Sequence, residues 1–363
     1  MADVSQTQIE EALKQVTDPN MEKDLVSAKA VKDIRIDGDK VSVDIVLGYP
    51  AAGYTDKLAA QLKEKVEAVD GISSAEFNIS WKIVSHSVQK GVEPIKGVKN
   101  IIAVASGKGG VGKSTTAVNL ALALSAEGAN VGILDADIYG PSMPRMLGVT
   151  GQPESEDGKT LSPMKSHNIQ SMSIGYLIDE ETPMIWRGPM VTQALEQLLN
   201  DTQWDDVDYL VIDLPPGTGD TQLTLAQKVP VTGAVIVTTP QDIALLDARK
   251  GLKMFEKVEV PVLGVIENMS IHICSNCGHE EHVFGEGGGQ RMADESHIDL
   301  LGSLPLDMSI RSSTDEGKPS VVADPDGRVA EIYRDISRRV AAKLALKAKD
   351  YSASFPKIVI QNN

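Results

Sequence analysis

IIAVASGKGGVGKSTT, residues 101–116, is the most informative stretch of the chain. It begins with an apolar, β-branched run that predicts a buried strand, and the apolar residues 117–124 predict a helix packed against a sheet. The loop between them has Gly107, four intervening residues, and then Gly-Lys-Ser at 112–114. This spacing is that of a phosphate-binding P-loop, and it lies between a strand and a helix as the motif requires.

The composition of the loop follows from what it is expected to bind. Glycines let backbone N–H groups turn inward around phosphate oxygens, and the N-terminus of the following helix adds the positive end of its dipole. Lys113 is expected to neutralise the β- and γ-phosphates of a nucleoside triphosphate, and Ser114 to hold Mg²⁺. The residues expected to contact the nucleotide here are Gly107, Lys108, Gly109, Gly110, Val111, Gly112, Lys113, Ser114 and Thr115.

Lys108 makes the loop more specific. With two lysines, the sequence KGGVGKST resembles the deviant Walker A motif of the MinD/ParA/nitrogenase iron protein class of ATPases. In that class the extra lysine reaches across a dimer interface to the phosphates bound by the partner subunit. The resemblance therefore implies ATP as the nucleotide, a homodimer as the working unit, and Lys108 and Lys113 as catalytic residues. A solvated loop lysine is the alternative for Lys108.

The overall composition limits the class of protein. A length of 363 residues suggests two domains, and 42% hydrophobic and 24% charged residues are globular values. A net charge of −16 argues against a nucleic-acid-binding or anionic-membrane surface, because both need clustered positive charge. The first residues lack a signal peptide's basic start and apolar run, and no apolar segment approaches the ~20 residues of a membrane span. We therefore expect a cytoplasmic protein without nucleic-acid or membrane partners.

Residues 1–90 are expected to form a small α+β domain. Apolar and polar residues alternate over 41–47, as in a half-buried strand, and residues 55–69 have helical spacing. The unit resembles the small domain that precedes the ATPase in Mrp-type proteins and occurs alone in iron–sulfur assembly factors. The matching residues are 18–19, 24–27, 31–34 and 41–47. Members of that family often carry a cysteine after this strand, where this chain has GYPAAG at 48–53, so a docking or regulatory role is favoured over a thiol role.

The rest of the chain alternates strands with helices. Residues 91–98 contain Gly and Pro and are expected to be a linker, followed by an ATPase domain over 99–363. Such alternation predicts a P-loop NTPase fold of class α/β, with a mostly parallel sheet covered on both faces by helices. The strands expected after the P-loop are 130–134, 209–213, 233–238, 262–269 and 301–306, and 328–347 is expected to be a final helix.

Acidic residues end two of these strands. Asp135 and Asp137 follow the strand at 130–134, and Asp213 ends the strand at 209–213 as a Walker B acid should. Carboxylates at this edge of the sheet suit Mg²⁺ and water, so Asp213 and Asp135 are expected partners of the magnesium site. By resemblance to the class, Asp137 orients the attacking water; a turn or N-cap role is the alternative for both Asp135 and Asp137. Gly217 lies where its N–H could sense the γ-phosphate.

Two further residues are expected near the nucleotide base. Asn268 ends the strand at 262–269, and its amide offers both a donor and an acceptor to an adenine edge. The class places an asparagine here for that purpose. The loop that contains Pro305 is then expected to pass near the base or ribose.

Cys274 and Cys277 are the two cysteines of the chain, spaced Cys-x-x-Cys. In a reducing compartment such a pair is more often metal-binding or redox-active than a structural disulfide. Two thiolates are half of a four-ligand site. Zinc completed by His279 and His282, a redox dithiol, inert thiols, and a Cys₄ site shared by two subunits all remain open. Four thiolates suit an iron–sulfur cluster or zinc.

The whole pattern resembles one family. The P-loop, the run DLPPGTGD at 213–220, the segment WRGPM at 186–190 and the cysteine pair together resemble the Mrp/ApbC iron–sulfur carriers, over about residues 5–347. The resemblance implies an ATP-hydrolysing carrier whose cysteines bridge a 4Fe-4S cluster between subunits. It further implies transfer of that cluster to apo iron–sulfur proteins, with scaffold proteins as further partners. The alternatives are a nucleotide-dependent dimerisation switch of the MinD/ParA type and a zinc-stabilised ATPase.

Overall fold

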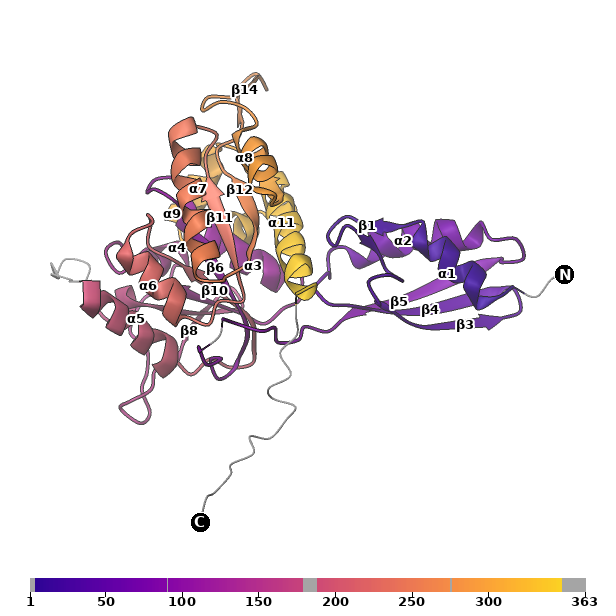
Figure 1. Cartoon of the computed structure of the whole chain (residues 1–363), viewed down its shortest axis with the longest axis horizontal. Helices are drawn as coiled ribbons and strands as arrows, with labels where there is room; N and C mark the ends of the chain where they lie inside the picture. The colour runs from indigo at the N-terminus through magenta and orange to yellow at the C-terminus, as the bar shows by residue number, and fades with distance from the viewer. Residues whose placement is uncertain (1–3, 90, 179–187, 275, 348–363) are drawn as a thin grey trace, which may run out of the picture.

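The computed structural model describes residues 4–89, 91–178, 188–274 and 276–347. Figure 1 shows an N-terminal unit on the right that projects from a larger unit on the left. Trp186 and Arg187 of the segment WRGPM lie outside the described residues.

The N-terminal unit is a three-stranded sheet with two helices on one face (Figure 1). Along its central strand, β4, alternate residues are buried, which is the pattern expected of a sheet with one covered face. Ser5 begins the first helix with a capping box, because its side chain accepts from the Gln8 N–H and Gln8 bonds back. The elements are α1 (Gln6–Lys14), β1 (Thr17–Asp18), β2 (Lys23–Asp24), β3 (Val31–Asp37), β4 (Lys40–Leu47), α2 (Thr55–Glu67) and β5 (Ser74–Trp81).

The larger unit is built on an eight-stranded sheet of order β15-β12-β11-β6-β10-β7-β9-β8. All neighbouring strands are parallel except β8, which pairs antiparallel with β9 at the edge. The predicted mostly parallel sheet is therefore confirmed. The strands are β6 (Val98–Ala105), β7 (Val131–Asp135), β8 (Met164–Ser166), β9 (Ile169–Ser173), β10 (Val207–Asp213), β11 (Gly233–Thr238), β12 (Val262–Glu267) and β15 (Leu300–Ser303).

Helices cover both faces of this sheet (Figure 1). Along β6, Ile102 and Val104 belong to one buried apolar cluster, while Ile101, Ala103 and Ala105 belong to another. Each face of the strand therefore has its own core, which explains why residues 101–105 of the strand are all apolar. The helices are α3 (Lys113–Ala126), α4 (Met143–Met146), α5 (Gly188–Asp201), α6 (Asp220–Lys228), α7 (Asp242–Lys257), α8 (Gly288–Ser296), α9 (Met308–Asp315), α10 (Ser320–Ala323) and α11 (Arg328–Ala345), with a 3-10 turn at Ile174–Tyr176.

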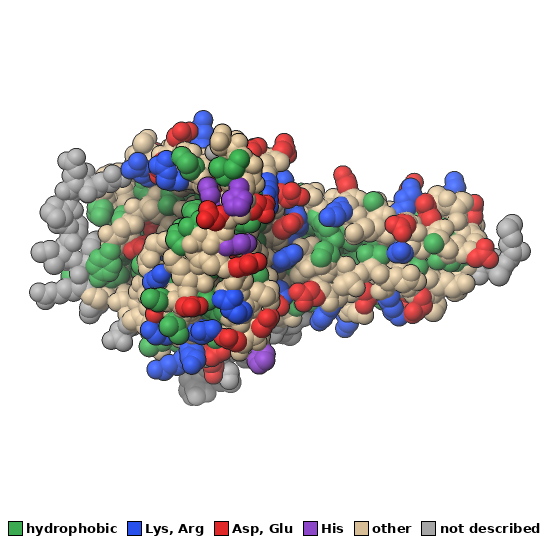
Figure 2. All heavy atoms as spheres, turned by 90° about the horizontal axis from the view of Figure 1, so that it is seen from above, with side chains coloured by type: hydrophobic (Ala, Val, Ile, Leu, Met, Phe, Trp, Pro, Cys, Tyr) green, Lys and Arg blue, Asp and Glu red, His purple; other side chains and the backbone are tan. Residues whose placement is uncertain are grey.

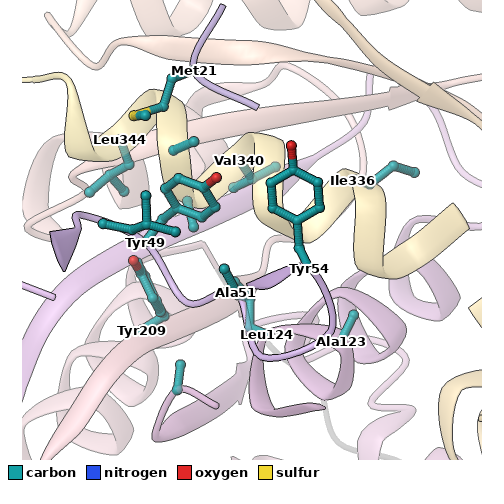
Figure 3. Packing of buried hydrophobic residues seen from close by; sticks show 14 of the residues in the cluster. Met21, Tyr49, Ala51, Tyr54, Ala123, Leu124, Tyr209, Ile336, Val340 and Leu344 are labelled. Atoms are coloured by element: carbon teal, nitrogen blue, oxygen red, sulfur yellow. The ribbon is translucent and has the colours of Figure 1, made fainter. Parts of the chain in front are cut away.

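The N-terminal unit packs on the ends of α3 and α11. Figure 3 shows side chains of the loop after β4 against both helices, and the apolar cluster runs without a break from one unit into the other. Glu127, fully buried at the end of α3, accepts a hydrogen bond from the Gly53 N–H at 2.9 Å and pairs with Arg338 of α11. The labelled residues of this contact include Tyr49, Ala51 and Tyr54 from the loop, Ala123 and Leu124 from α3, and Ile336, Val340 and Leu344 from α11.

A small hairpin carries the cysteines. It consists of β13 (His272–Ile273) and β14 (Glu280–Glu281), and it stands at the top of Figure 1, away from the N-terminal unit. Within the described ranges, none of the helices combines the length and the apolar character needed to span a bilayer.

Candidate nucleotide and cysteine sites

The P-loop is shaped by close approaches that only glycine allows. A Cβ on Gly107 would lie 2.1 Å from the backbone carbon of Asp247 in α7. Gly112, the residue before α3, has φ 81°, and a Cβ there would lie 2.2 Å from Asn268 Nδ2. The loop thus lies close to α7 and to the residue after β12, and no side chain caps the N-terminus of α3, where backbone N–H groups favour an anion.

Lys113 and Asp213, which the sequence assigns to phosphate and Mg²⁺ binding, form a buried ion pair with each other. Lys113 Nζ lies 2.5 Å from Asp213 Oδ1 and 3.3 Å from Ser114 Oγ, and the two charged side chains are 6% and 0% exposed. Burial raises the pKa of Asp213, and the ammonium of Lys113 opposes that rise. The second carboxylate oxygen, Oδ2, is buried and has no hydrogen-bond partner among the described residues. An orphaned carboxylate oxygen beside the Ser114 hydroxyl fits the oxygen-rich surroundings that Mg²⁺ prefers.

Asp135 organises the loop that carries Asp137. Its Oδ2 accepts hydrogen bonds from the N–H groups of Ser142 (2.9 Å) and Met143 (3.1 Å), and its Oδ1 accepts from the Asp137 N–H (3.1 Å). Complete burial and the nearby Asp213 raise the pKa of Asp135 to about 7. Asp137 is only half-buried, and burial raises its pKa as well. The water-orienting role of Asp137 and the magnesium role of Asp135 stay predictions.

Lys108 and Gly217 contact neighbouring loops in this conformation. Lys108 Nζ lies 3.5 Å from the side-chain oxygen of Gln241, just before α7, and this oxygen also accepts from Thr239. Gly217, at φ 106°, donates its N–H to the Ser106 carbonyl at 2.9 Å. The contact of Gln241 with Lys108 was not predicted from the sequence. The only sequence signal for it was the position of Gln241 just after an expected strand.

Asn268 and Pro305 lie between the P-loop and the cysteine hairpin. Asn268 Nδ2 donates to the Val111 carbonyl at 2.9 Å. Pro305 is buried, and both of its sequence neighbours form hydrogen bonds with the segment that leads into the hairpin. Ser270 N–H donates to the Leu304 carbonyl, and Leu306 N–H donates to the Ile271 carbonyl. Base binding by Asn268 and Pro305 stays a prediction. The contact of Asn268 with the P-loop was not anticipated, because nothing local in the sequence links the two positions.

The cysteines lie at the exposed tip of the hairpin. Cys274 N–H donates to the His279 carbonyl at 2.9 Å, and Gly278 N–H donates to the Cys274 carbonyl at 2.8 Å, which folds the chain back on itself. Both thiols are free, and Cys277 is exposed. Backbone N–H groups of Asn276 and Cys277 lower the pKa of the Cys274 thiol. Figure 2 looks down on this end of the molecule, where histidine and acidic side chains gather at the surface.

The described residues of one chain do not complete a metal site around this pair. Among the described residues, no three His, Cys, Asp or Glu side chains come together in a geometry suited to a metal ion. His282, one of the predicted alternatives, uses Nδ1 to contact the Ser270 carbonyl at 2.9 Å. Within the part of the chain that the structure describes, the hairpin therefore presents the two thiols with no third metal-binding side chain in place.

Family models match both units. The model of the NUBPL iron-transfer P-loop NTPases, of the ParA group, matches residues 97–341. The chain belongs to this family. A second model, described as iron-sulfur cluster assembly protein, matches residues 6–78 of this NUBPL-type NTPase. The resemblances drawn from the sequence are confirmed for both units.

Relatives match the NUBPL-type NTPase over most of its length. The iron-sulfur cluster carrier protein of Escherichia coli (strain K12) is 53% identical over 327 residues, which cover 90% of this chain and 89% of the relative. The iron-sulfur cluster transfer protein NUBPL of Mus musculus is 49% identical and covers 72% of this chain and 83% of the relative.

Solved structures resemble the larger unit of this NTPase. A nucleotide-binding protein of Archaeoglobus fulgidus, in complex with ADP and with cobalt, has a TM-score of 0.57 at 36% identity, covering 65% of this chain and 92% of that one. The cell division ATPase MinD of Pyrococcus furiosus has a TM-score of 0.51 at 22% identity, covering 66% and 98%. The second likeness supports the fold alone.

Proposed function

We propose that this NTPase is an iron–sulfur cluster carrier that holds its cargo on Cys274 and Cys277 and passes it to apo-proteins. The observation that carries the proposal is a pair of free thiols, Cys277 exposed and Cys274 partly exposed, on a hairpin that follows strand β12 of the large sheet. The name of the Escherichia coli relative, iron-sulfur cluster carrier protein, supports the same cargo. Four thiolates are the usual ligands of a 4Fe-4S cluster, so two chains would supply one cluster.

We further propose that the working unit is a homodimer. The half-site of thiols requires a second source of ligands, and a second copy supplies it. Lys108 lies against Gln241, and the α7 residues Ile243 and Leu246 that follow are 70% and 54% exposed, three positions apart on one helix face. An exposed apolar pair beside the signature lysine is the surface that a second subunit would cover. In this arrangement Lys108 acts on the partner's nucleotide.

The chemistry of the nucleotide site is hydrolysis of ATP. The N–H groups of the P-loop and Lys113 bind the phosphates, and Ser114 and Asp213 would hold Mg²⁺, which neutralises phosphate charge when bound. Asp137 orients water for attack on the γ-phosphorus; the bond to the β–γ bridging oxygen breaks and ADP leaves. Lys108 and Lys113 stabilise the charge on the transferred group. We propose that this reaction drives loading or release of the cluster.

We propose that the N-terminal unit is a fixed part of the carrier. Residues 1–90 form this small domain, residues 91–98 the linker, and residues 99–363 the ATPase domain. Its loop after β4 is occupied by packing on α3 and α11, which supports a structural or docking role. A reducing compartment such as the cytoplasm would keep both thiols available for metal.

Anaerobic reconstitution with iron and sulfide tests the cargo. The wild-type chain is expected to gain iron, sulfide and broad absorbance near ~400 nm, and Cys274→Ala and Cys277→Ala are each expected to lose them. His279→Ala is the matched control, because it removes a metal-binding side chain from the same loop and is expected to retain the cluster. A cluster that survives loss of both cysteines contradicts the proposal, and zinc with no iron in protein purified anaerobically contradicts the cargo.

A further inference from the structure

The peptide between Val111 and Gly112 in the P-loop is held from outside the loop by Asn268. This side chain is 9% exposed, and its Nδ2 donates a 2.9 Å hydrogen bond to the Val111 carbonyl. The approach is possible only because position 112 is glycine, since a Cβ would lie 2.2 Å from the same Nδ2. A buried amide bonded this way fixes the orientation of one peptide plane of the loop.

The other end of the same amide holds the first residue of the chain that leads to the cysteines. Asn268 Oδ1 accepts the Met269 N–H at 2.9 Å, and Met269 has φ 57°, a region that residues other than glycine seldom adopt. Cys274 follows Asn268 by six positions (274 − 268). One side chain therefore joins the P-loop to the base of the cysteine hairpin.

A trans peptide makes this junction sensitive to what the P-loop binds. Its C=O and N–H point in opposite directions, so holding the Val111 carbonyl aims the Gly112 N–H to the other side of the peptide. A phosphate oxygen that accepts this N–H polarises the peptide and strengthens the bond that the carbonyl accepts from Asn268. Nucleotide binding to the P-loop thereby changes the strength of the hydrogen bond that the Asn268 side chain donates.

Other hydrogen bonds also anchor the base of the hairpin: Leu306 N–H donates to the Ile271 carbonyl at 2.8 Å, and His272 Nδ1 lies 3.1 Å from the Leu306 carbonyl. Ser270 N–H and Oγ both bond to the Leu304 carbonyl, at 2.9 Å and 3.0 Å, and His282 Nδ1 lies 2.9 Å from the Ser270 carbonyl. These contacts tie the hairpin to the loop between β15 and α9 and to itself. The hairpin strands have two residues each, so a shift at Met269 meets little resistance from the ladder.

We propose that Asn268 is a positioning residue that transmits nucleotide occupancy of the P-loop to the cysteine hairpin. The inference rests on the proposed function in that the loop binds nucleotide and the thiols are the working groups. Coupling between two sites is reciprocal: whatever factor nucleotide imposes on the hairpin, occupancy of the hairpin imposes on the nucleotide. Such factors are typically about 5–150-fold.

The test reads the hairpin through its thiols, without a cluster. Because Cys274 and Cys277 are the chain's only cysteines, the rate of alkylation by iodoacetamide reports the hairpin of the full-length apo-protein. Rates are measured with and without Mg-ADP at a concentration shown by direct binding to saturate each variant. Wild-type protein is expected to change its rate at least about fivefold on adding nucleotide.

Two variants break the junction in different ways. Asn268→Ala removes both bonds, and Asn268→Asp keeps an acceptor for the Met269 N–H but places an oxygen against the Val111 carbonyl. Both are expected to bring the nucleotide effect on alkylation close to onefold. Asn119→Ala is the matched control: this fully buried asparagine also donates to a backbone carbonyl (Thr115, 2.9 Å) and accepts a backbone N–H (Val321, 3.1 Å), but it joins α3 to α10. It is expected to keep the nucleotide effect.

The outcomes separate coupling from other roles. If Asn268 only read the base, its variants would bind nucleotide more weakly yet keep the full rate change at saturation, and the inference would be overturned. The same holds if wild-type protein shows no change, or if Asn119→Ala loses it too, since general loosening would then be the cause. A failure to bind iron would contradict the proposed cargo, but it would not affect the conclusion drawn from the alkylation rates.

Discussion

The P-loop and the cysteine hairpin differ in how tightly the surrounding fold holds them. In the P-loop, a Cβ on Gly107 or Gly112 would lie 2.1 Å or 2.2 Å from a neighbour, whereas Gly278 beside the cysteines has nothing within 4 Å. Lys113 is buried against Asp213, while Cys277 is exposed. The fold therefore holds parts of the P-loop closely but leaves the thiol pair on an open hairpin, and this difference is the reason for proposing a shared site at the hairpin.

The closely packed region extends along α3 to the N-terminal unit. Glu127→Ala is expected to have the largest effect, a loss of stability at this contact. Removing this buried carboxylate leaves Arg338 without one of its partners and the Gly53 N–H without an acceptor. We expect a loss of about 3 kcal/mol or more in the free energy of unfolding, measured by urea denaturation. Glu11→Ala, at an exposed ion pair with Lys14, is expected to cost about 0–1 kcal/mol. Equal costs would contradict the buried contact.

Lys113→Ala should abolish the chemistry of the phosphate site and leave the hairpin intact. We expect ATP hydrolysis to fall by about 10²–10³-fold, because one preorganised charge at the transferred phosphate is lost. Lys99→Ala is the matched control, since Lys99 also pairs with a shielded carboxylate, that of Asp208 at 2.7 Å, but at the opposite end of β6 from the P-loop. Unchanged hydrolysis in Lys113→Ala would contradict the site assignment.

Lys108→Ala tests whether Lys108 acts on the nucleotide of a partner subunit. Hydrolysis is expected to fall by about 10²-fold. Mixing this variant with Asp137→Asn should restore part of the activity, because a mixed dimer has one site with an intact Asp137 and the partner's intact Lys108. If Lys108 acted within its own chain, the mixture would be no more active than the two variants apart.

The smallest effect is expected at the Cys274 thiol. Because backbone N–H groups lower the pKa of Cys274, we expect more thiolate there at neutral pH than in a short unstructured cysteine peptide, and alkylation a few times faster. The difference should fade as the pH rises above the ordinary thiol pKa. Peptide mapping after brief alkylation measures the rate at Cys274, and the loss of the difference in urea is the control.

The sequence predicted the tightly held region better than the loosely held one. Strand β6, the P-loop and α3 are contiguous in the chain, so their pattern shows directly, and Asp213 follows from the apolar run before it. The parallel sheet follows from alternating elements. These features depend on local periodicity and on spacing that one motif fixes.

What the sequence could not predict depends on contacts between distant positions. Asn268 and Val111 are 157 positions apart, and Glu127 and Arg338 are 211 apart. No local pattern records such pairs. The placing of the N-terminal unit on α3 was missed for the same reason. The role of Asp135 in holding the Asp137 loop also needed the fold, because its donors come from residues up to Met143.

Native mass spectrometry of the anaerobically reconstituted protein tests most directly that the exposed thiol pair is half of a shared site. We expect a homodimer that carries one 4Fe-4S cluster, or about two iron atoms per chain. Mixing wild-type chains with Cys274→Ala/Cys277→Ala chains should yield no mixed dimer with a full cluster. A monomer that carries a complete cluster, or a dimer with four iron atoms per chain, would contradict it.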